Sequence, residues 1–213
     1  NKHNYLLCGN VIGYCDVVRD LGVLIDTKLK FNAHIAYITA KAHHRANLIL
    51  RSFASRDKHI LFKAFIVYVR PLLEYATVVW SPRNAKSILD IEKVQKRFTK
   101  RLSGLKSLSY FERIKELRCD TLERRRLLFD LVMCFKIFNH FVDVNFTDFF
   151  QTPIAKFTRG HAYKLFVCHT RTKARANFFA SYIVKVWNSL PCDVVNAKTV
   201  NEFKAHIKTF NFS

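Results

Sequence analysis

Basic side chains recur along one face of a helix that we expect over residues 84–102. Apolar residues such as Ile91 and Phe98 return with the helical period, so one face can enter a core while the cations stay in solvent. Such a face can neutralise nucleic-acid phosphates; the alternative is a helix that is only well solvated. The expected phosphate contacts are Lys93, Lys96, Arg97, Lys100 and Arg101.

A second basic cluster, Arg124, Arg125 and Arg126, stands at the expected beginning of another helix. Cations at that end oppose the helix dipole, and an external anion would relieve the conflict. The cluster predicts weaker phosphate contacts, and a purely structural role is an equally open alternative.

Groups suited to catalysis or metal binding are sparse. A metal-dependent polymerase or nuclease needs carboxylates that converge on divalent cations. The local acidic cluster of Asp16, Asp20 and Asp26 is better explained by strand ends and turns. The pairs 168–169 (Cys-His) and 43–44 (His-His) lack companions at zinc-ligand spacing. We therefore expect no catalytic residue, no metal site and no cofactor in this chain.

The amino-acid composition indicates which class of partner the chain binds. Lys and Arg number 36 against 16 Asp and Glu, and half of the residues are apolar, so we expect a folded protein with a polyanionic partner. Nucleic acid is the favoured partner, and an anionic membrane surface is the rival. The most apolar window, 64–80, is interrupted by Arg70, Pro71 and Glu74, which excludes an ordinary spanning helix. Six scattered cysteines without a C-x-x-C pair indicate reduced thiols and an intracellular location, nucleus or cytoplasm.

The elements that must position these cations follow from local signals. Short apolar runs with three glycines in 4–26 predict two or three strands. Helices are expected from Asn32, as N-cap, to about 53, and then over 57–69, 84–102, 109–117, 120–141, 178–190 and 199–210. Capping boxes are expected at 109–112, 120–123 and 199–202. The segment 145–174 has no clear period and a scatter of basic residues that includes Lys156 and Arg159.

The order of short motifs along the chain resembles a known family. The motifs are DLGVLID at 20–26, YVRPLLEY at 68–75, VWSP at 79–82, IEKVQKRF at 91–98, LERR at 122–125 and WNSLP at 187–191. Together they resemble the end of the palm, the thumb and the region after it in reverse transcriptases of non-LTR retrotransposons, the LINE-type elements of jockey-like and chicken-repeat-like kinds. Each motif alone is weak, and the ordered set covers nearly the whole chain.

The resemblance implies a mainly α fold, a helical thumb-like bundle preceded by a small β remnant of the palm. It divides the chain into a palm-end strand remnant (1–30), a helical thumb-like domain (31–144) and a basic C-terminal extension with two helices (145–213). Fingers, the catalytic palm with its aromatic-x-Asp-Asp motif and an endonuclease would then lie upstream of Asn1, and Mg²⁺ is expected only in that palm.

The function implied is part of an RNA-directed DNA polymerase: the chain would grip the RNA template and DNA primer while the palm copies RNA into DNA. No position matches a catalytic residue of the family, so none is assigned. The alternative is a stand-alone basic helical nucleic-acid-binding module, a decayed or host-captured remnant of such an element.

Overall fold

The computed structural model describes residues 5–153, 161–210 and 212. The expected basic residues Lys156 and Arg159 lie outside the described residues. Strands come first: β1 (Leu6–Leu7), β2 (Asn10–Val11), β3 (Val17–Asp20) and β4 (Val23–Asp26). Helices follow: α1 (Asn32–Ser52), α2 (Lys58–Tyr68), α3 (Arg70–Glu74), α4 (Thr77–Trp80), α5 (Ala85–Lys100), α6 (Tyr110–Glu116), α7 (Leu122–Phe138), α8 (Phe146–Phe149), α9 (Lys173–Asn177), α10 (Phe179–Asn188), α11 (Cys192–Val195) and α12 (Val200–Thr209). The predicted mainly α fold with a short β segment at its N-terminal end is confirmed.

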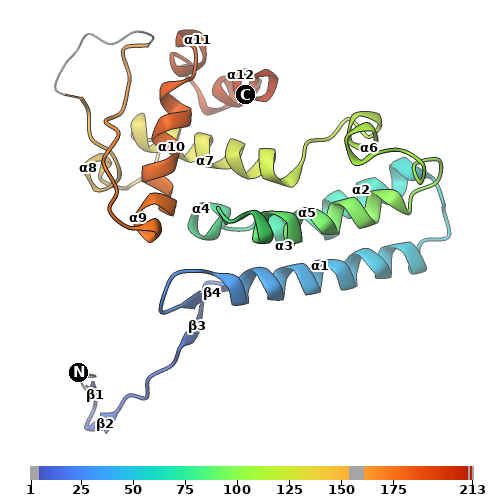
Figure 1. Ribbon diagram of the computed structural model, residues 1–213, viewed down its shortest axis with the longest axis horizontal. Helices are drawn as coiled ribbons and strands as arrows, with labels where there is room; N and C mark the ends of the chain where they lie inside the picture. Colours follow the sequence, from blue (N-terminus) through green and yellow to red (C-terminus); the bar gives the residue numbers. More distant parts are fainter. Residues whose placement is uncertain (1–4, 154–160, 211, 213) are drawn as a thin grey trace.

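The helices are stacked in layers (Figure 1). The long helix α1 forms one side, α5 packs along it together with α2 and α3, and α7 packs on the other side of α5. Helices α10 and α12 cover the remaining face of α7. In this arrangement α5, the expected basic helix, lies beside α1, and one face of α5 stays exposed to solvent.

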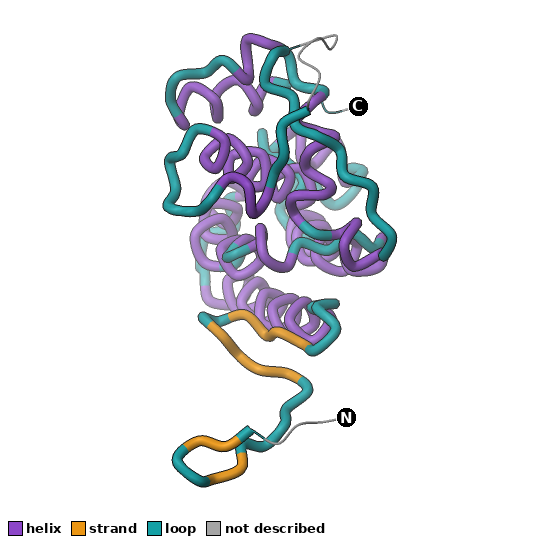
Figure 2. The backbone as a smooth tube through the Cα atoms, turned by 90° about the vertical axis from the view of Figure 1, so that its left-hand side faces the viewer, coloured by secondary structure: helices purple, strands orange, loops and turns teal. Residues whose placement is uncertain are grey.

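Two antiparallel hairpins precede the bundle. β1 pairs with β2, and β3 pairs with β4 in the register Asp20↔Val23. Leu21 and Gly22 between them have φ values of +43° and +87°, which is the pattern of a two-residue type I′ turn. Figure 2 shows the β1–β2 hairpin projecting away from the helices, and its apolar side chains are exposed. Only the β3–β4 hairpin is attached to the bundle.

Two side chains attach the β3–β4 hairpin. The buried His34 ring of α1 accepts a hydrogen bond from the backbone N–H of Leu24 through Nδ1 (3.2 Å). The hydroxyl of Tyr75 donates to the carbonyl of Leu21 (3.1 Å). The ring of Trp80 contacts His34 edge to face with ring centroids 5.1 Å apart and is 1% exposed, so this tryptophan packs in the core below the attachment of the hairpin.

The beginning of α1 differs from the expectation. Asn32 is not the N-cap; Phe31 holds that position in the left-handed region, with no side-chain cap. The carboxylate of Asp26 instead accepts from the N–H groups of Lys28, Lys30 and Phe31 and fixes the turn that enters the helix. A side chain from the preceding strand has therefore replaced the local cap, and the structural role expected for Asp26 is confirmed.

The stretch after α2 also differs. The expected end of the second helix at residue 69 rests on Pro71, because a proline disfavours helical geometry in the residue before it. At Arg70 this expectation is wrong: α3 begins there. Pro71 lies in the first turn, where a missing N–H breaks no intrahelical hydrogen bond. Asp57 caps the preceding helix α2 as a conventional N-cap, accepting from the N–H groups of His59 and Ile60.

Helices α5 and α6 begin where their sequences indicate. The side chain of Asn84 caps α5 through the N–H of Ser87 (2.8 Å), and Gly104 follows the helix with φ +75°. Ser109 and Glu112 form the expected capping box of α6. These starts were predictable because the signals are contained in three or four consecutive residues.

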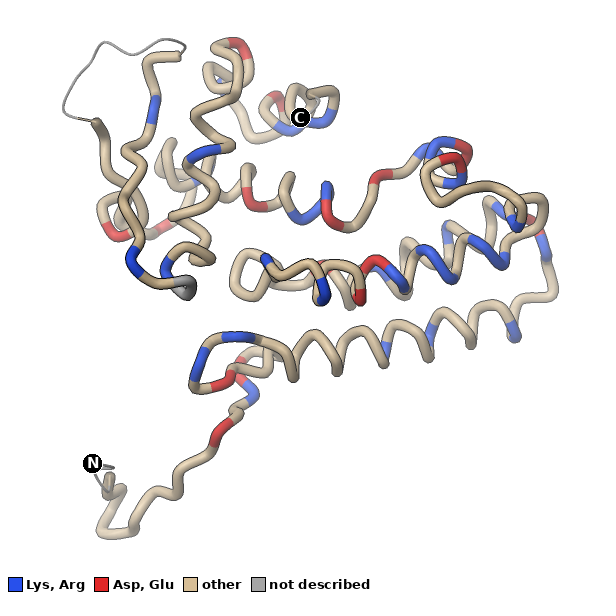
Figure 3. The backbone as a smooth tube through the Cα atoms, viewed as in Figure 1, with Lys and Arg blue, Asp and Glu red and all other residues tan. Residues whose placement is uncertain are grey.

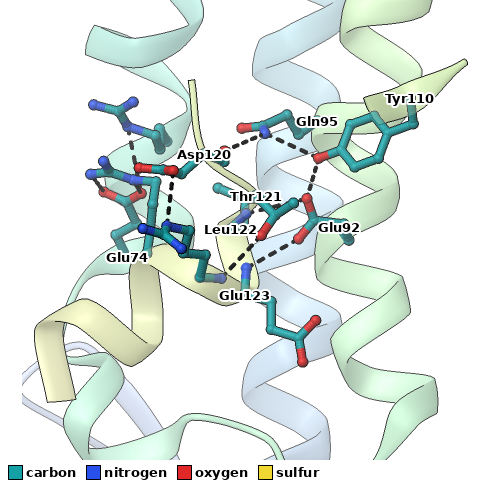
Figure 4. Close-up of polar contacts among 11 residues, drawn as sticks. Glu74, Glu92, Gln95, Tyr110, Asp120, Thr121, Leu122 and Glu123 are labelled. Carbon is teal, nitrogen blue, oxygen red and sulfur yellow. Dashed lines mark hydrogen bonds and ion pairs between the residues drawn. The ribbon is translucent and has the colours of Figure 1, made fainter. Parts of the chain in front are cut away.

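The expected capping box of Asp120 with Glu123 at α7 is wrong. Thr121 is the N-cap and accepts from the N–H of Arg124 (3.1 Å). The carboxylate of Glu92, on α5, accepts from the N–H groups of Leu122 and Glu123, 3.2 Å each, and from the hydroxyl of Tyr110 (Figure 4). The positive end of α7 is thus satisfied by a buried carboxylate from another helix.

Two apolar cores meet along α7. The first packs α1, α2, α3 and α5 around residues such as Phe65 and Phe98, whose rings stack 4.7 Å apart, and reaches Leu122. The second begins at Leu131 and is rich in aromatic rings contributed by α7, α10 and α12. Since α7 belongs to both cores, the domain boundary expected at 144/145 stays a prediction.

Polar contacts also join the second core to the first part of the chain. Asp130 on α7 is buried and accepts from the hydroxyl of Tyr182 and from the Arg83 guanidinium (3.3 Å). These two hydrogen-bond partners lie on α10 and in the loop before α5, respectively. Burial raises the pKa of the Asp130 carboxyl to about 6. The last helix, α12, begins at the expected N-cap, with Thr199 accepting from the N–H of Glu202 (3.1 Å). The reciprocal bond of the expected capping box is displaced by one residue, because the Glu202 carboxylate accepts from the N–H of Lys198 (2.8 Å).

Candidate functional site

The face of α5 that turns away from the core carries a line of cations (Figure 3). Lys86, Lys93 and Lys100 are spaced seven residues apart, so they lie almost on one line along the helix, and all three are exposed. The Lys93 side chain is 55% exposed. Ile91 and Phe98 lie on the opposite, buried face. The apolar and basic faces expected for this helix are confirmed.

A groove of about 670 Å³ runs between α5 and α1, and Lys86, Lys93 and Arg97 lie on its α5 wall. Lys100 is exposed one turn further along α5 and does not line the groove. Its floor contains Ile35 and small residues of α1, which leave room between the helices. The groove is lined by Asn32, Ile35, Ala36, Thr39, Ala40, His43, Asn84, Lys86, Ser87, Asp90, Lys93 and Arg97. The cations on the α5 wall and the amide and imidazole groups of Asn32 and His43 on the α1 wall are donors suited to phosphate and sugar oxygens. The Thr39 hydroxyl donates to the carbonyl of Ile35 and offers an acceptor.

Four ionisable groups set the electrostatics inside the groove: Lys93 with Asp90, and Arg97 with His43. Lys93 forms an ion pair with Asp90 (2.7 Å), which partly neutralises the wall and lowers the pKa of the Asp90 carboxyl. Burial and the charge of Arg97 lower the pKa of His43 on the facing wall. His43 is therefore neutral at pH 7, and Arg97 carries the uncompensated positive charge opposite it.

The remaining expected contacts of α5 lie beside the groove. Lys96 turns toward α6, where its Nζ lies 5.0 Å from the centre of the Tyr110 ring. Arg101 donates from Nη1 to Oδ1 of Asn47 on α1 (2.6 Å) and so joins the far ends of the two helices. Lys93 and Arg97 are thus brought together in the groove, whereas Lys96 and Arg101 are directed to neighbouring helices.

The arginines at the beginning of α7 are held by the protein itself. Arg124 pairs with Asp120 (3.1 Å) and donates to the backbone carbonyls of Lys208 (2.8 Å) and Phe210 (2.9 Å). Arg125 donates to both carboxylate oxygens of Glu74, one through Nη2 at 3.0 Å. These two side chains tie α7 to α3 and to the C-terminal segment.

Arg126 is placed differently from its neighbours. It is 2% exposed, and neither terminal nitrogen has a hydrogen-bond partner in the part of the chain that the structure describes. Its side chain lines a second cavity and does not face the surface groove. The three arginines therefore do not form one basic face, although their adjacent positions suggested a single cluster.

Metal ligands are not gathered in the described residues: no group of three or more His, Cys, Asp or Glu side chains is arranged to hold an ion. Within the ranges 5–153 and 161–210, no helix is both long and apolar enough to cross a membrane.

Several groove residues were not singled out from the sequence. Lys86 could have been found, since it precedes Lys93 by the same seven residues that separate Lys93 from Lys100. The α1 wall, with Thr39 and His43, gave no such signal, because periodicity does not say which helix packs beside α5.

Comparisons with known proteins return one informative relative. No family model matches the chain, and no solved structure matches it. The chain is 30% identical over 134 residues to the uncharacterized protein B0403.1 of Caenorhabditis elegans, which covers 60% of this chain and 68% of that protein.

Proposed function

The chain belongs to the same family as the uncharacterized protein B0403.1 of Caenorhabditis elegans, and from this premise we propose that it binds nucleic acid through the groove between α1 and α5. Membership brings no activity with it, so the proposal rests on the chain's own residues. The observation that carries it is the line of exposed cations on α5 beside a polar wall of α1.

The chemistry of the groove supports a sugar-phosphate backbone as ligand. Lys86, Lys93 and Arg97 in the groove, with the exposed Lys100 beside it, supply positive charge for phosphates and would displace the counterions condensed on the nucleic acid. The amide NH₂ of Asn84 supplies a neutral donor, and the Thr39 hydroxyl, which donates to the carbonyl of Ile35 (2.7 Å), supplies an acceptor for sugar hydroxyls. No large aromatic ring lines the groove, so the proposal is backbone binding with little base readout.

The wider role that we propose follows the motif resemblance. The chain acts as the thumb and post-thumb part of a LINE-type reverse transcriptase in the nucleus or cytoplasm, and it holds RNA template and DNA primer for a catalytic palm. Coding sequence for an aromatic-x-Asp-Asp motif upstream of Asn1 would support this role. Its absence from the gene would leave the groove as a stand-alone binding module.

The groove is tested by replacing Lys93, Lys96, Arg97 and Lys100 together with Gln and measuring affinity for a fluorescent RNA–DNA duplex by anisotropy. The wild-type affinity should fall steeply with salt, and the variant's logarithmic salt slope should be smaller by roughly 3, since about 0.9 counterions are released for each phosphate contact and Lys96 contributes less. Circular dichroism should show that the variant stays folded, because these side chains are outside the core.

A matched control removes four exposed cations elsewhere: Lys115, Arg118, Lys185 and Lys204 to Gln. Both variants lose the same formal charge, so a general effect of the net charge of +20 would weaken both equally. A flat salt response, or equal losses in the two variants, would remove the groove proposal. A third experiment measures sedimentation of the protein with anionic vesicles. Binding to vesicles without binding to the duplex would indicate that the partner is a membrane surface.

A further inference from the structure

A cavity of about 330 Å³ lies apart from the groove, at the junction of the two cores. The loop before α5 contributes Pro82 and Arg83, α7 contributes Arg126 and Asp130, and Phe212 covers one side. The cavity therefore collects residues from three separate parts of the chain.

The cavity holds unpartnered donors. Arg126 is 2% exposed, its Nη1 and Nη2 have no hydrogen-bond partner, and it belongs to none of the ion pairs between described residues. The Nε of Arg83 is also buried without a partner. An unpaired buried guanidinium is strongly unfavourable, which indicates that the folded protein surrounds it with a ligand.

The carboxylate of Glu92 on α5, whose charge acts on Arg126, already accepts other hydrogen bonds. Both oxygens of Glu92 accept hydrogen bonds, from Tyr110 and from the backbone N–H groups of Leu122 and Glu123. Those same bonds satisfy the beginning of α7, so the candidate site consists of side chains and not of a free helix terminus. Glu92 therefore accepts no hydrogen bond from Nη1 or Nη2 of Arg126.

The cavity also holds an unpartnered acceptor. Asp130 accepts from Tyr182 and Arg83 through Oδ2, whereas its Oδ1 is buried and has no partner among the described residues. A ligand that satisfies both sides must accept from guanidinium groups and also donate one proton. A protonated phosphate does both, because its P–O oxygens accept and its P–OH group donates. Sulfate at neutral pH carries no proton to donate.

We propose that this cavity binds a phosphate group that shares one proton with Asp130, with Arg126 and Arg83 as its cationic ligands. The volume exceeds that of phosphate alone, so the chemical class of ligand is a phosphomonoester, and free inorganic phosphate is the smallest member. The exposed Glu123 at the rim opposes a second negative charge and limits affinity. This site is independent of the groove proposal, since none of its ligands lines the groove.

The test measures thermal unfolding and isothermal titration of the purified chain with inorganic phosphate, with AMP and with sodium sulfate, at ionic strength matched with chloride. Phosphate or AMP should bind and raise the melting temperature, whereas sulfate should not. Tighter binding of AMP would identify a nucleotide-type monoester, and equal binding would identify the phosphate group alone as the ligand. If neither phosphate nor AMP binds, or if sulfate binds as well as phosphate, the proposal is overturned.

Two substitutions test whether phosphate binds in this cavity. Arg126→Gln should weaken phosphate binding by about 10-fold or more, because two charge-assisted hydrogen bonds are lost. It should also raise the melting temperature in phosphate-free buffer, since an uncompensated buried charge is removed. Arg118→Gln, an exposed arginine outside the cavity, is the matched control and should change neither.

A rival explanation is that Arg126 closes onto Asp130, four residues later on the same helix face. In that case Arg126→Gln would lower the melting temperature and the wild type would show no phosphate response, which would overturn the proposal. Glu123→Gln keeps the test decisive if Arg126→Gln does not fold: removing the rim carboxylate should tighten phosphate binding, and unchanged affinity would count against the cavity. Duplex affinity should be the same in all these variants, so failure of one site leaves the other intact.

Discussion

The backbone N–H of Leu122 donates to Oε1 of Glu92 across thirty residues of chain, at 3.2 Å. A carboxylate on α5 thereby satisfies the positive end of α7, and the side chain is 6% exposed. The Tyr110 hydroxyl donates to the same oxygen, and burial beside Glu92 raises the pKa of Tyr110, so the phenol keeps its proton as donor. One side chain thus joins α5, α6 and α7.

We predict that Glu92→Gln destabilises the protein by about 1–3 kcal/mol, because the amide NH₂ must face a backbone or hydroxyl donor in a buried site. Urea denaturation followed by circular dichroism measures the change. Glu116→Gln, which removes an exposed carboxylate paired with Lys58, is the control and should unfold like the wild type. Equal stability of Glu92→Gln and wild type would contradict the capping role.

The sequence predicted the helices better than it predicted what joins them. The beginnings of α5, α6 and α12 follow from Asn84, Ser109 and Thr199, whose cap signals are local. The beginnings of α1 and α7 were misassigned because Asp26 and Glu92 reach them from other elements. Asp26 lies only five residues before Phe31, whereas Glu92 lies thirty residues before Leu122, and no short-range pattern encodes that second contact.

The same limit applied to the candidate site. The basic face of α5 could be predicted from the helical periodicity of its residues alone. The burial of Arg126 could not, because three consecutive arginines point in three different directions around a helix. Asp120, the partner of Arg124, lies only four residues before it, whereas Glu74, the partner of Arg125, lies on α3 and is brought close by the packing of α3 on α7.

A second prediction concerns Glu74 and Arg125, which form a two-pronged ion pair with side chains 12% and 23% exposed. Glu74→Gln should destabilise by about 2 kcal/mol, because Arg125 is left half-buried without its partner. The double variant with Arg125→Gln should be more stable than the sum of the single effects predicts, by about 1 kcal/mol. Strict additivity in urea denaturation would show that the pair makes no coupled contribution.

The buried Asp130 gives a pH prediction. Its folded pKa of about 6 lies above the ordinary value of 3.8, so the folded state binds the proton more tightly than the unfolded chain. The stability gained from the protonated form is full below the ordinary pKa and is lost as the pH rises from about 4 to about 6. The loss amounts to roughly 3 kcal/mol.

Comparison of wild type with Asp130→Asn isolates this effect. Burial lowers the pKa of His34, His43 and His161, which destabilises the protein on acidification, but these histidines are present in both chains and cancel in the difference. The free energy of unfolding of the wild type, relative to Asp130→Asn, should fall between pH 4 and pH 6 and stay level above it. Parallel pH profiles would refute the assignment.

Gly22 supplies a prediction for the hairpin. Its φ of +87° is strained for any residue with a Cβ, while the nearest atom to such a Cβ, on Tyr75, lies at an ordinary 3.6 Å. Gly22→Ala should therefore cost about 1 kcal/mol through backbone strain alone. Faster hydrogen exchange of the β3–β4 amides would report it. Gly13→Ala, at a position without positive φ and with open space around it, should leave exchange unchanged.

The last prediction separates the two flanks of α5. Arg97 lines the groove opposite His43, whereas Lys96, one residue earlier, lies over the Tyr110 ring on the α6 side. Arg97→Gln and Lys96→Gln remove the same charge from adjacent positions, so they differ only in direction. If the duplex lies in the groove, Arg97→Gln should reduce the logarithmic salt slope of binding by about 1 and Lys96→Gln by clearly less. A larger effect from Lys96 would move the binding surface to the α5–α6 flank, because phosphate contacts act over a few ångströms and the two side chains cannot both face the same strand.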